Sequence, residues 1–436
     1  MNIRGPIALF IVFSLFSCEK NPVLPEPEPV FEILVRNEFD ALDAHFAVFI
    51  SDPTTGTTKA FRWVPEHDTI RLQVPNSTST AVFDCTVVKI TTVNAPGTGI
   101  RDTLLALTTY TNLATLASIN LRNTTFQRAS SVRFSLTGMN TLDSIVVPDA
   151  YAITKPEASN NFTGEYWCYH TGQCWIRVLA DGSPFWRFIR FNNINGETLE
   201  ANTLNVNLLL PILAPPLQLN FPFVADWKYQ VDGMVDTANL QFFPLSQPLR
   251  PPGTYVPFVD VADIFEPVNN DLFNPNRPYN GLRIQLQGTE AAVGGYTYRS
   301  DHFYSAMPSV LPIPNFDLAP TTLSDQRLFA VQCIGNFDLL AFSRTRSGYN
   351  IHQTIHWEVL TKPRVGILSY RLPDVPSPLA GVYPPLKNYA FNAGVLARAE
   401  SYEKGLSYEE IIHQYLGAED VLWQARAGYL GKERGL

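Results

Sequence analysis

Alternation of hydrophobic and polar residues predicts β-strands along most of this chain. The alternation has the two-residue period of a strand that buries one face. It recurs at 31–35 (FEILV), 44–50 (AHFAVFI), 69–74 (TIRLQV) and 131–136 (SVRFSL). Residues 81–90 and 103–110 are apolar with less alternation, which indicates more deeply buried strands. Turn residues separate these runs at the spacing of a two-layer β fold. We therefore expect a β-sandwich of the immunoglobulin-like class over residues 31–148.

A second β-rich region follows a polar linker at 148–161. Residues 162–372 carry further period-two patterns, and they are interrupted by several proline-rich stretches. Frequent prolines disfavour long helices and favour strands that are joined by surface loops. We therefore expect a larger β-rich domain over 162–372.

Two cysteines in this region predict a β-hairpin. If Cys168 and Cys174 face each other across a five-residue loop, Trp167 falls opposite Trp175. The same register creates a salt pair three residues further from the cysteines, so several favourable cross-strand pairs agree. Directly paired strand residues lie about 4.5–5.5 Å apart between Cα atoms, which a disulfide can bridge. We therefore expect a disulfide between Cys168 and Cys174.

A second turn, centred on 182–183, returns the chain to another strand. This turn pairs Trp175 with Arg190 and Arg177 with Phe188. One face of the three strands then gathers aromatic and charged side chains. Its candidate ligand-binding residues are Glu165, Trp167, Trp175, Arg177, Trp186 and Arg190. Aromatic rings beside hydrogen-bonding charges suit a glycan, whereas the alternative is that this face packs inside a two-layer β domain.

The last part of the chain, 385–436, has helical periodicity. Apolar stripes predict three short helices between residues 393 and 430. Ser407 and Glu410 have the spacing of a capping box at the start of the second helix. These helices either dock on the β domain or form a handle for a protein partner.

Composition narrows the classes of partner. The formal net charge is −8, and charged residues make up 17% of the chain, below the roughly 25% typical of soluble domains. Because no basic stripe is available to neutralise phosphates, we expect no nucleic-acid partner. Whether Cys85 pairs with Cys333 stays open.

Signatures of catalysis and metal binding are weak. His352 and His356 have the spacing of a helical zinc pair, but Gln353 stands where zincins have glutamate, and the local alternation predicts a strand. A Ser-x-x-Lys motif at 401–404 lacks its partner motifs. We expect no metal and no cofactor. Paired carboxylates for glycoside hydrolysis stay open, because their spacing exists only in three dimensions.

The start of the chain has the pattern of an export signal. Arg4 precedes an uncharged apolar run, Pro6 to Phe16, which is too short to span a bilayer as a helix. The run closes on Leu15-Phe16-Ser17-Cys18, which resembles the lipobox of bacterial lipoproteins. In that family the cysteine is acylated and the preceding segment is removed. The resemblance implies a signal peptide over 1–17, lipidation of Cys18 and attachment to a lipid bilayer.

Residues 18–30 carry four prolines, which favour an extended polyproline II conformation and predict a semi-rigid tether. By the same resemblance, the acidic residues after Cys18 suit the outer membrane, with the inward or outward side left open. The alternatives are an ordinary cleaved signal peptide and a short membrane-associated helix.

These observations favour a lipid-anchored protein of the cell envelope that acts as a non-catalytic binding, structural or assembly module. Its partner would contact the C-terminal helices. The alternative is a surface lipoprotein that binds carbohydrate or processes polysaccharide through the aromatic face, so the question of enzymatic activity stays open.

Overall fold

The fold is seen in a computed structural model. It describes residues 31–39, 44–75, 77–78, 80–94, 101–121, 130–146, 150–152, 162–168, 172–182, 186–194, 199–206, 210–212, 226–236, 241–244, 259–260, 281–290, 295–305, 308, 311–312, 314–316, 317–321, 325, 327–347, 352–389, 391–417 and 423–436. The predicted signal peptide, Cys18 and the tether lie outside these residues. None of the described helices is both long and apolar enough to cross a bilayer.

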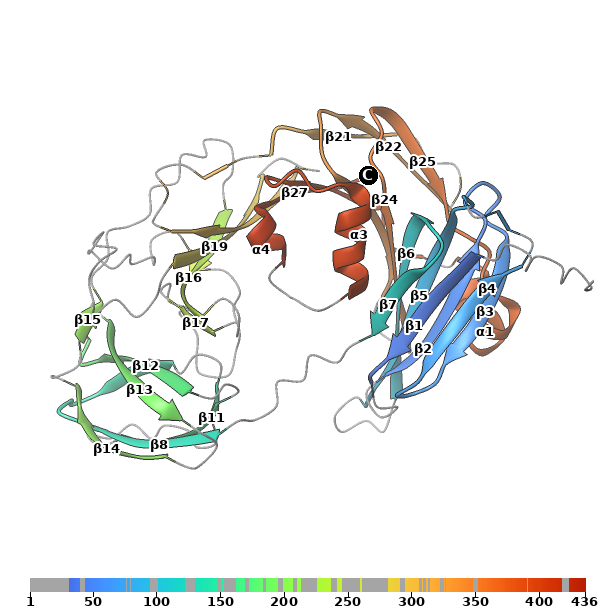
Figure 1. The fold of residues 1–436 in the computed structure, drawn as a ribbon. Helices are drawn as coiled ribbons and strands as arrows, with labels where there is room; N and C mark the ends of the chain where they lie inside the picture. The colour runs from blue at the N-terminus through green and yellow to red at the C-terminus, as the bar shows by residue number, and fades with distance from the viewer. Residues whose placement is uncertain are drawn as a thin grey trace, which may run out of the picture.

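The molecule is mostly β, as predicted, and one large mixed sheet forms its middle layer (Figure 1). Among the described residues this sheet has 13 strands. Their order is β17 (Gln241–Pro244), β16 (Asp226–Asp236), β19 (Gly281–Thr289), β20 (Thr297–Tyr304), β27 (Tyr429–Gly435), β26 (Leu396–Tyr402), β23 (Leu339–Arg346), β24 (Gln353–Thr361), β6 (Arg101–Leu113), β5 (Phe83–Asn94), β2 (His45–Ser51) and β3 (Thr58–Val64), with β18 (Val259–Asp260) beside β16. The sheet therefore joins segments from both halves of the sequence.

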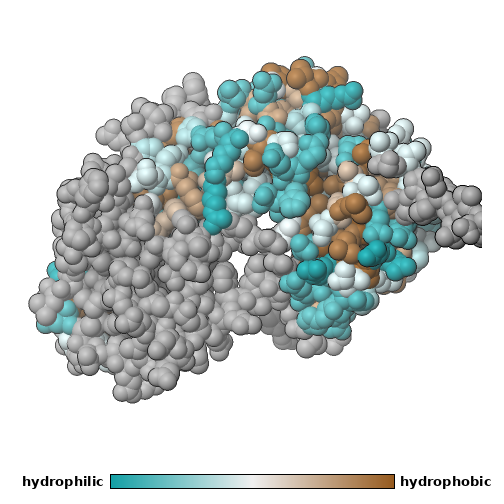
Figure 2. Space-filling view, in the orientation of Figure 1, coloured by the Kyte–Doolittle hydropathy of each residue, from teal (hydrophilic) through white to brown (hydrophobic). Residues whose placement is uncertain are grey.

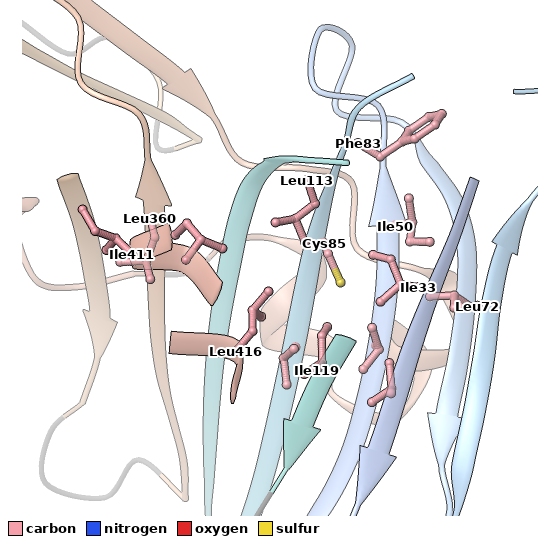
Figure 3. Packing of buried hydrophobic residues seen from close by; sticks show 14 of the residues in the cluster. Ile33, Ile50, Leu72, Phe83, Cys85, Leu113, Ile119, Leu360, Ile411 and Leu416 are labelled. Carbon is pink, nitrogen blue, oxygen red and sulfur yellow. The ribbon is translucent and has the colours of Figure 1, made fainter. Parts of the chain in front are cut away.

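A second sheet covers one face of the middle sheet, over the strands that come from the N-terminal part of the chain. It consists of β4 (Thr69–Val74), β1 (Phe31–Asn37) and β7 (Ala117–Leu121). Side chains of both sheets fill the space between them, together with helix α3 (Tyr408–Gly417), as Figure 3 shows. The buried residues labelled there include Ile33, Ile50, Cys85, Ile119, Leu360 and Ile411. A β-sandwich is confirmed for 31–121, and α3 docks on it, whereas the strands of 130–146, which were predicted to belong to it, lie in other sheets.

The opposite face of the middle sheet is covered by a third layer. This layer contains the sheet β21 (Asp317–Pro320), β22 (Leu328–Ile334) and β25 (Gly366–Arg371), followed by the short helices α1 (Ser377–Val382) and α2 (Pro384–Lys387). Trp357 is fully buried in this second core, and the rings of Phe329 and Phe342 stack at 5.3 Å between centroids. The middle sheet is therefore buried on both faces over much of its width.

Burial on both faces explains why the central strands are almost continuously apolar. In β2, Val48 and Ile50 face the first core, while Ala47 and Phe49 face the second. Successive side chains of a strand point to opposite faces, so both sets must be apolar here. The deep burial predicted for 81–90 and 103–110 has the same cause, because β5 and β6 contribute to both cores.

Two four-stranded sheets form a separate part of the β structure. One has the order β10 (Ala150–Ala152), β11 (Phe162–Cys168), β8 (Ser130–Thr137) and β14 (Leu199–Asn205). The other has the order β15 (Leu210–Ile212), β13 (Trp186–Ile194), β12 (Gly172–Ala180) and β9 (Leu142–Val146). Leu136 and Val206 are buried in the first sheet and its flank, and Ile145 and Val178 in the second.

The sheets do not follow the domain boundaries expected from the sequence. The middle sheet takes β2, β3, β5 and β6 from the 31–148 segment and β19, β20, β23 and β24 from the 162–372 segment. These two segments are therefore not structurally independent. The sequence pattern marks strands, but it carries no direct signal for pairing between strands that lie far apart along the chain.

The C-terminal segment is only partly helical. The second predicted helix is confirmed as α3, and its capping box forms, with Ser407 N donating to Glu410 Oε2 at 2.8 Å and Glu410 N donating to Ser407 Oγ at 3.2 Å. The first predicted helix is wrong, because 396–402 forms β26 between β23 and β27. The third shrinks to α4 (Trp423–Ala427), followed by β27. Pairing on both edges overrides the helical propensity of LARAE.

Docking of α3 leads to a stability prediction. Ile411 is fully buried, so Ile411→Ala removes packed methyl groups and leaves a cavity, and we expect it to lower the free energy of unfolding by about 2–5 kcal/mol. His413 is exposed on the same helix, and His413→Ala should change it by less than about 0.5 kcal/mol. Urea denaturation of both variants checks this. Equal effects would show that α3 does not belong to the core.

Candidate functional site

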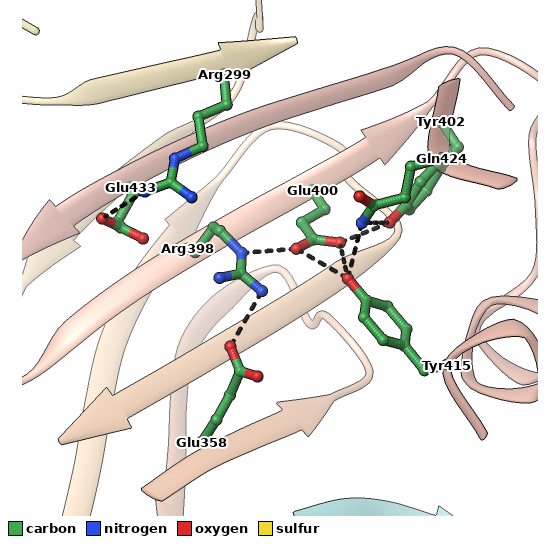
Figure 4. Close-up of polar contacts among 8 residues, drawn as sticks. All are labelled: Arg299, Glu358, Arg398, Glu400, Tyr402, Tyr415, Gln424 and Glu433. Atoms are coloured by element: carbon green, nitrogen blue, oxygen red, sulfur yellow. Dashed lines mark hydrogen bonds and ion pairs between the residues drawn. The ribbon is translucent and has the colours of Figure 1, made fainter. Parts of the chain in front are cut away.

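A network of charged side chains lies on the face of the middle sheet that α3 also covers (Figure 4). Arg398 of β26 is its centre. Its Nε donates to Glu400 Oε1 at 2.6 Å, and its Nη2 donates to Glu358 Oε1 at 3.0 Å. Arg398 and Glu400 alternate with Ala397 and Ala399, which face the second apolar core, so strand geometry places both charges on one face.

Aromatic and amide groups complete the hydrogen bonding of the network. Tyr402 donates its hydroxyl to Glu400 Oε2 at 2.6 Å, and Tyr415 of α3 donates to the same oxygen at 3.0 Å. Gln424 of α4 donates its amide to the Tyr415 hydroxyl at 2.9 Å. Glu400 thereby connects the sheet to both C-terminal helices.

Burial makes these contacts energetically important. The Glu400 side chain is only 1% exposed, while those of Arg398 and Glu358 are about one-fifth exposed. Burial lowers the pKa of Arg398, but the carboxylates of Glu400 and Glu358 more than reverse this, and the net shift is upward. Burial and the nearby Glu400 carboxylate raise the pKa of both Tyr402 and Tyr415 well above the ordinary value. The arginine therefore stays charged and the tyrosines stay neutral donors.

The network continues toward the next strands of the sheet. Arg398 is the direct cross-strand partner of Glu433 on β27, and Glu433 in turn lies 3.8 Å from Arg299 of β20. Opposite charges therefore alternate from β24 to β20. Such alternation favours one register among these strands, because a slip would place like charges together.

The geometry of the two carboxylates suits a structural role, holding helices on the sheet, better than general acid–base chemistry. Glu358 and Glu400 are bridged by one guanidinium, and Glu400 also accepts two tyrosine hydroxyls. A catalytic pair of carboxylates instead needs space between the two groups for the substrate. The arrangement fixes α3 and α4 on the sheet.

A second buried carboxyl joins the middle sheet to the third layer. Asp84 of β5 is 1% exposed and accepts the Tyr370 hydroxyl of β25 at 2.8 Å and the Asn112 backbone N–H at 2.9 Å. Burial raises the pKa of Asp84 to about 6, although both hydrogen bonds favour the ionised form. This carboxyl therefore makes the contact between the layers sensitive to pH.

The two histidines with zinc-like spacing have different hydrogen-bonding neighbours. His352 lies 3.1 Å from Asp102 through Nδ1, and His356 lies 3.0 Å from the Thr345 hydroxyl. His356 lies on β24, as the strand interpretation predicted. Within the described part of the chain, no group of three or more His, Cys, Asp or Glu side chains is placed to hold a metal ion.

The predicted hairpin between Cys168 and Cys174 is wrong at the level of strand pairing. Cys168 ends β11, which pairs with β8 and β10, whereas Cys174 lies on β12, which pairs with β13 and β9. The chain thus passes from one sheet to another, where a hairpin was expected. Trp167 and Glu165 accordingly lie in a different sheet from Trp175. The side chains of both cysteines lie outside the described set.

The second predicted register is confirmed. Trp175 pairs with Arg190, and Arg177 pairs with Phe188, in the β12–β13 ladder. Because the side-chain period is two, the β12–β13 face that holds these four residues also holds Trp186. The aromatic and arginine side chains themselves are not described.

The opposite face of these strands belongs to a core. Val178 is fully buried opposite the buried Ile145, whereas Leu179, on the face of Trp175 and Arg177, is half-buried. Arg187, a charged residue on the apolar side, donates Nη1 to the backbone oxygen of Val206 at 3.1 Å and so connects the two small sheets. This backbone contact explains how a charge is accommodated there.

Cys85 and Cys333 are both free thiols and both buried. Cys85 belongs to the first core and Cys333 to the second, on opposite sides of the middle sheet. The sheet therefore separates the two thiols, and they do not form a disulfide with each other.

Sequence reasoning missed Arg398 and Glu400 because the segment was assigned to a helix. The available signal was the two-residue alternation of 396–402, with small residues at 397 and 399 between larger ones. Pairing with β23 and β27 supplies the remaining information, and it is not local.

Comparisons with known proteins add little. No family model matches the chain, and no curated protein matches it. Among solved structures, the chain is similar to "The tip fimbrial protein Mfa3 from Porphyromonas gingivalis with C-terminal truncation", at 12% identity. The match covers 47% of this chain and 95% of that chain, with a TM-score of 0.17. A TM-score this low carries no argument about function.

The charged network gives a stability prediction. Glu400→Gln leaves Arg398 partly unpaired in a buried site, and we expect it to lower the free energy of unfolding by about 3–5 kcal/mol. Glu409 pairs with Lys362 at an exposed position, so Glu409→Gln should cost at most about 1 kcal/mol. Chemical denaturation measures both. Comparable losses of stability in the two variants would contradict a structural role for Glu400.

Asp84 gives a prediction for pH dependence. Its pKa is raised from 3.8 to about 6 in the folded chain, so the carboxyl holds its proton more tightly there than in the unfolded chain. Its contribution to stability is therefore complete below pH 3.8 and is lost as the pH rises through about 6. The total loss is roughly 3 kcal/mol.

Asp84→Asn removes this titration while keeping a side chain that can hydrogen-bond. Thermal unfolding of the two proteins between pH 4 and pH 7 should show the variant gaining stability relative to the parent as the pH rises. A constant difference would contradict a raised pKa.

Proposed function

We propose that this protein is an exported lipoprotein of the cell envelope that acts as a non-catalytic binding, structural or assembly module. The observation that carries this proposal is the apolar run that begins at Pro6 and closes on Leu15-Phe16-Ser17-Cys18. One acyl chain holds a protein at a membrane only marginally, while two or more hold it stably. Lipidation of Cys18 would therefore keep the molecule at a bilayer, and the lipoprotein resemblance points to the outer membrane.

The described structure is compatible with a rigid module. The middle sheet is covered on both faces, and the partly buried charges of Glu358 and Arg398 are matched to each other and to the buried Glu400. Such a body can present a surface without changing shape. The C-terminal helices contribute α3 to its core, so a protein partner would contact their outer faces.

Lipidation is tested by changing one residue. The Cys18→Ala variant should lose all incorporation of a labelled fatty acid and all excess mass on the N-terminal peptide, because its thiol is the attachment point. Cys174→Ser is the matched control and should keep both. Acylation that survives in Cys18→Ala would overturn the proposal.

A second candidate is glycan binding through the β12–β13 face. It is favoured by the register that places Trp175, Arg177, Phe188 and Arg190 on one face, while the buried Val178 lies on the other. Rings beside guanidinium groups offer an apolar platform with hydrogen-bond donors.

The face is tested with a matched tryptophan pair. Trp175→Ala should weaken binding to a bacterial polysaccharide at least about tenfold, as loss of a central aromatic contact does. Trp167→Ala should not, because Trp167 lies on β11 in the other sheet. Pull-down with insoluble polysaccharide measures both, and unchanged binding by Trp175→Ala would remove this candidate.

A further inference from the structure

Several strands begin or end together at one end of the middle sheet. Phe83, which begins β5, pairs with Leu113, which ends β6. The Thr111 hydroxyl near the end of β6 donates to that of Thr361, which ends β24, at 3.1 Å. The Phe31 ring, at the start of β1, lies 4.7 Å from the Phe83 ring. We call this edge of the molecule the tether end, because the chain from Cys18 enters the fold here.

Exposed aliphatic side chains concentrate at the tether end. Nine large hydrophobic residues are exposed in the described part of the chain, and five of them lie there. They are Val82, Leu116, Ile334, Val365 and Ile367. Scattered exposed aliphatics need no explanation, but a group on one end of a molecule marks an interaction surface.

Each of the five is placed at this end by strand pairing or by its neighbour. Val82 precedes Phe83, and Leu116 donates its N–H to the backbone oxygen of Glu32 at 2.7 Å. Leu340 pairs with Thr361, which ends β24, so the short connection from Ile334 to Leu340 leads to this end. Cys333 pairs with Gly366, which places Val365 opposite Ile334. Val365 is 80% exposed and Ile367 is 68% exposed. Figure 2 shows hydrophobic side chains at the top of the view, over β22 and β25.

The length of the tether fits contact between this end and a bilayer. Thirteen peptide units separate Cys18 from Phe31, and an extended proline-rich chain of that length spans about 40 Å. The distance along the fold is shorter. Phe31 touches Phe83, and the adjacent Asp84 binds Tyr370 of β25. Val365 precedes β25 and lies five residues before Tyr370, at most about 17 Å from it.

We propose that the tether end rests on the lipid bilayer, with the five aliphatic side chains in the boundary between head groups and acyl chains. This inference rests on the proposed lipidation of Cys18. Transfer of aliphatic side chains from water into that boundary is favourable. Attachment through the tether raises the concentration of this surface near the bilayer. A contact that is too weak to hold the free protein at the bilayer therefore becomes populated.

The contact is mainly apolar. Lys362 and Arg364 are exposed beside Val365 and can extend to the lipid head groups. However, Lys362 pairs with Glu409 at 3.2 Å, so acidic side chains share this end of the molecule. The contact between the tether end and the bilayer should therefore persist at high salt. High salt would weaken a contact that depended on anionic lipids.

The test attaches the chain to lipid by chemistry, so that it does not depend on acylation in the cell. The chain from Cys18 onward, which keeps every described residue, is coupled through Cys18 to a maleimide lipid in vesicles of phosphatidylethanolamine and phosphatidylglycerol. Coupling at Cys18 is verified by peptide mass. Amide hydrogen exchange of 362–371 and 114–117 is then compared between coupled and free chain.

We expect exchange in both peptides to slow several-fold on coupling, at low and at high salt. Val365→Asp with Ile367→Thr should abolish the slowing in 362–371. Leu104→Thr is the matched control, because Leu104 is exposed near the start of β6, at the opposite end of the sheet, and the variant should keep the slowing. Both variants should exchange like the parent chain when free, which shows that each folds.

Three results would overturn the inference. One is unchanged exchange of the coupled chain. Another is slowing that the double variant keeps. The third is equal, concentration-dependent slowing in the free chain, which assigns the surface to a second copy of the protein. The proposed lipoprotein function fails separately, through the absence of an acyl group on Cys18 in cells.

Discussion

The parallel pairing of β6 with β24 is the constraint on which the rest of the structure depends. It joins Thr103–Tyr110 to Gln353–Leu360, two segments about 250 positions apart. Without it the N-terminal sandwich and the C-terminal strands would form separate sheets. With it, one sheet carries both cores, and the third layer and α3 can pack on surfaces to which both ends of the chain contribute. Such a long-range contact has a high entropic cost, which extensive burial on both sides offsets.

The charged network performs on one face what apolar packing performs elsewhere. Arg398, Glu400 and Glu358 occupy positions on the face where neighbouring strands bury aliphatic groups. A buried charge is tolerated only when partners surround it, so this solution fixes which strands and helices meet there. It adds specificity to α3, whose apolar stripe alone could slide along the sheet. Asp84 connects the middle sheet to the third layer in the same way, with a pH-dependent contribution.

The rigid body and the tether together define the proposed role. A lipid-anchored chain that rests on the bilayer through Val365 and its neighbours would hold its other surfaces at a fixed height and orientation. Those surfaces include the β12–β13 face with Trp175 and Arg190. A binding or assembly module benefits from such orientation, because the entropy of aligning it is reduced before a partner arrives.

The sequence by itself determined the features that depend on neighbouring residues. Alternation predicted the N-terminal β-sandwich, the β12–β13 register follows from the turn after Ala180, and the Ser407–Glu410 capping box is a four-residue signal. Only the tertiary structure decided which strands meet. It placed Cys168 and Cys174 in different sheets, turned 396–402 into a strand and brought Glu358 to Arg398. The physical reason is that helix caps and turns are settled by local hydrogen bonds, whereas strand partners are chosen by burial across the whole chain.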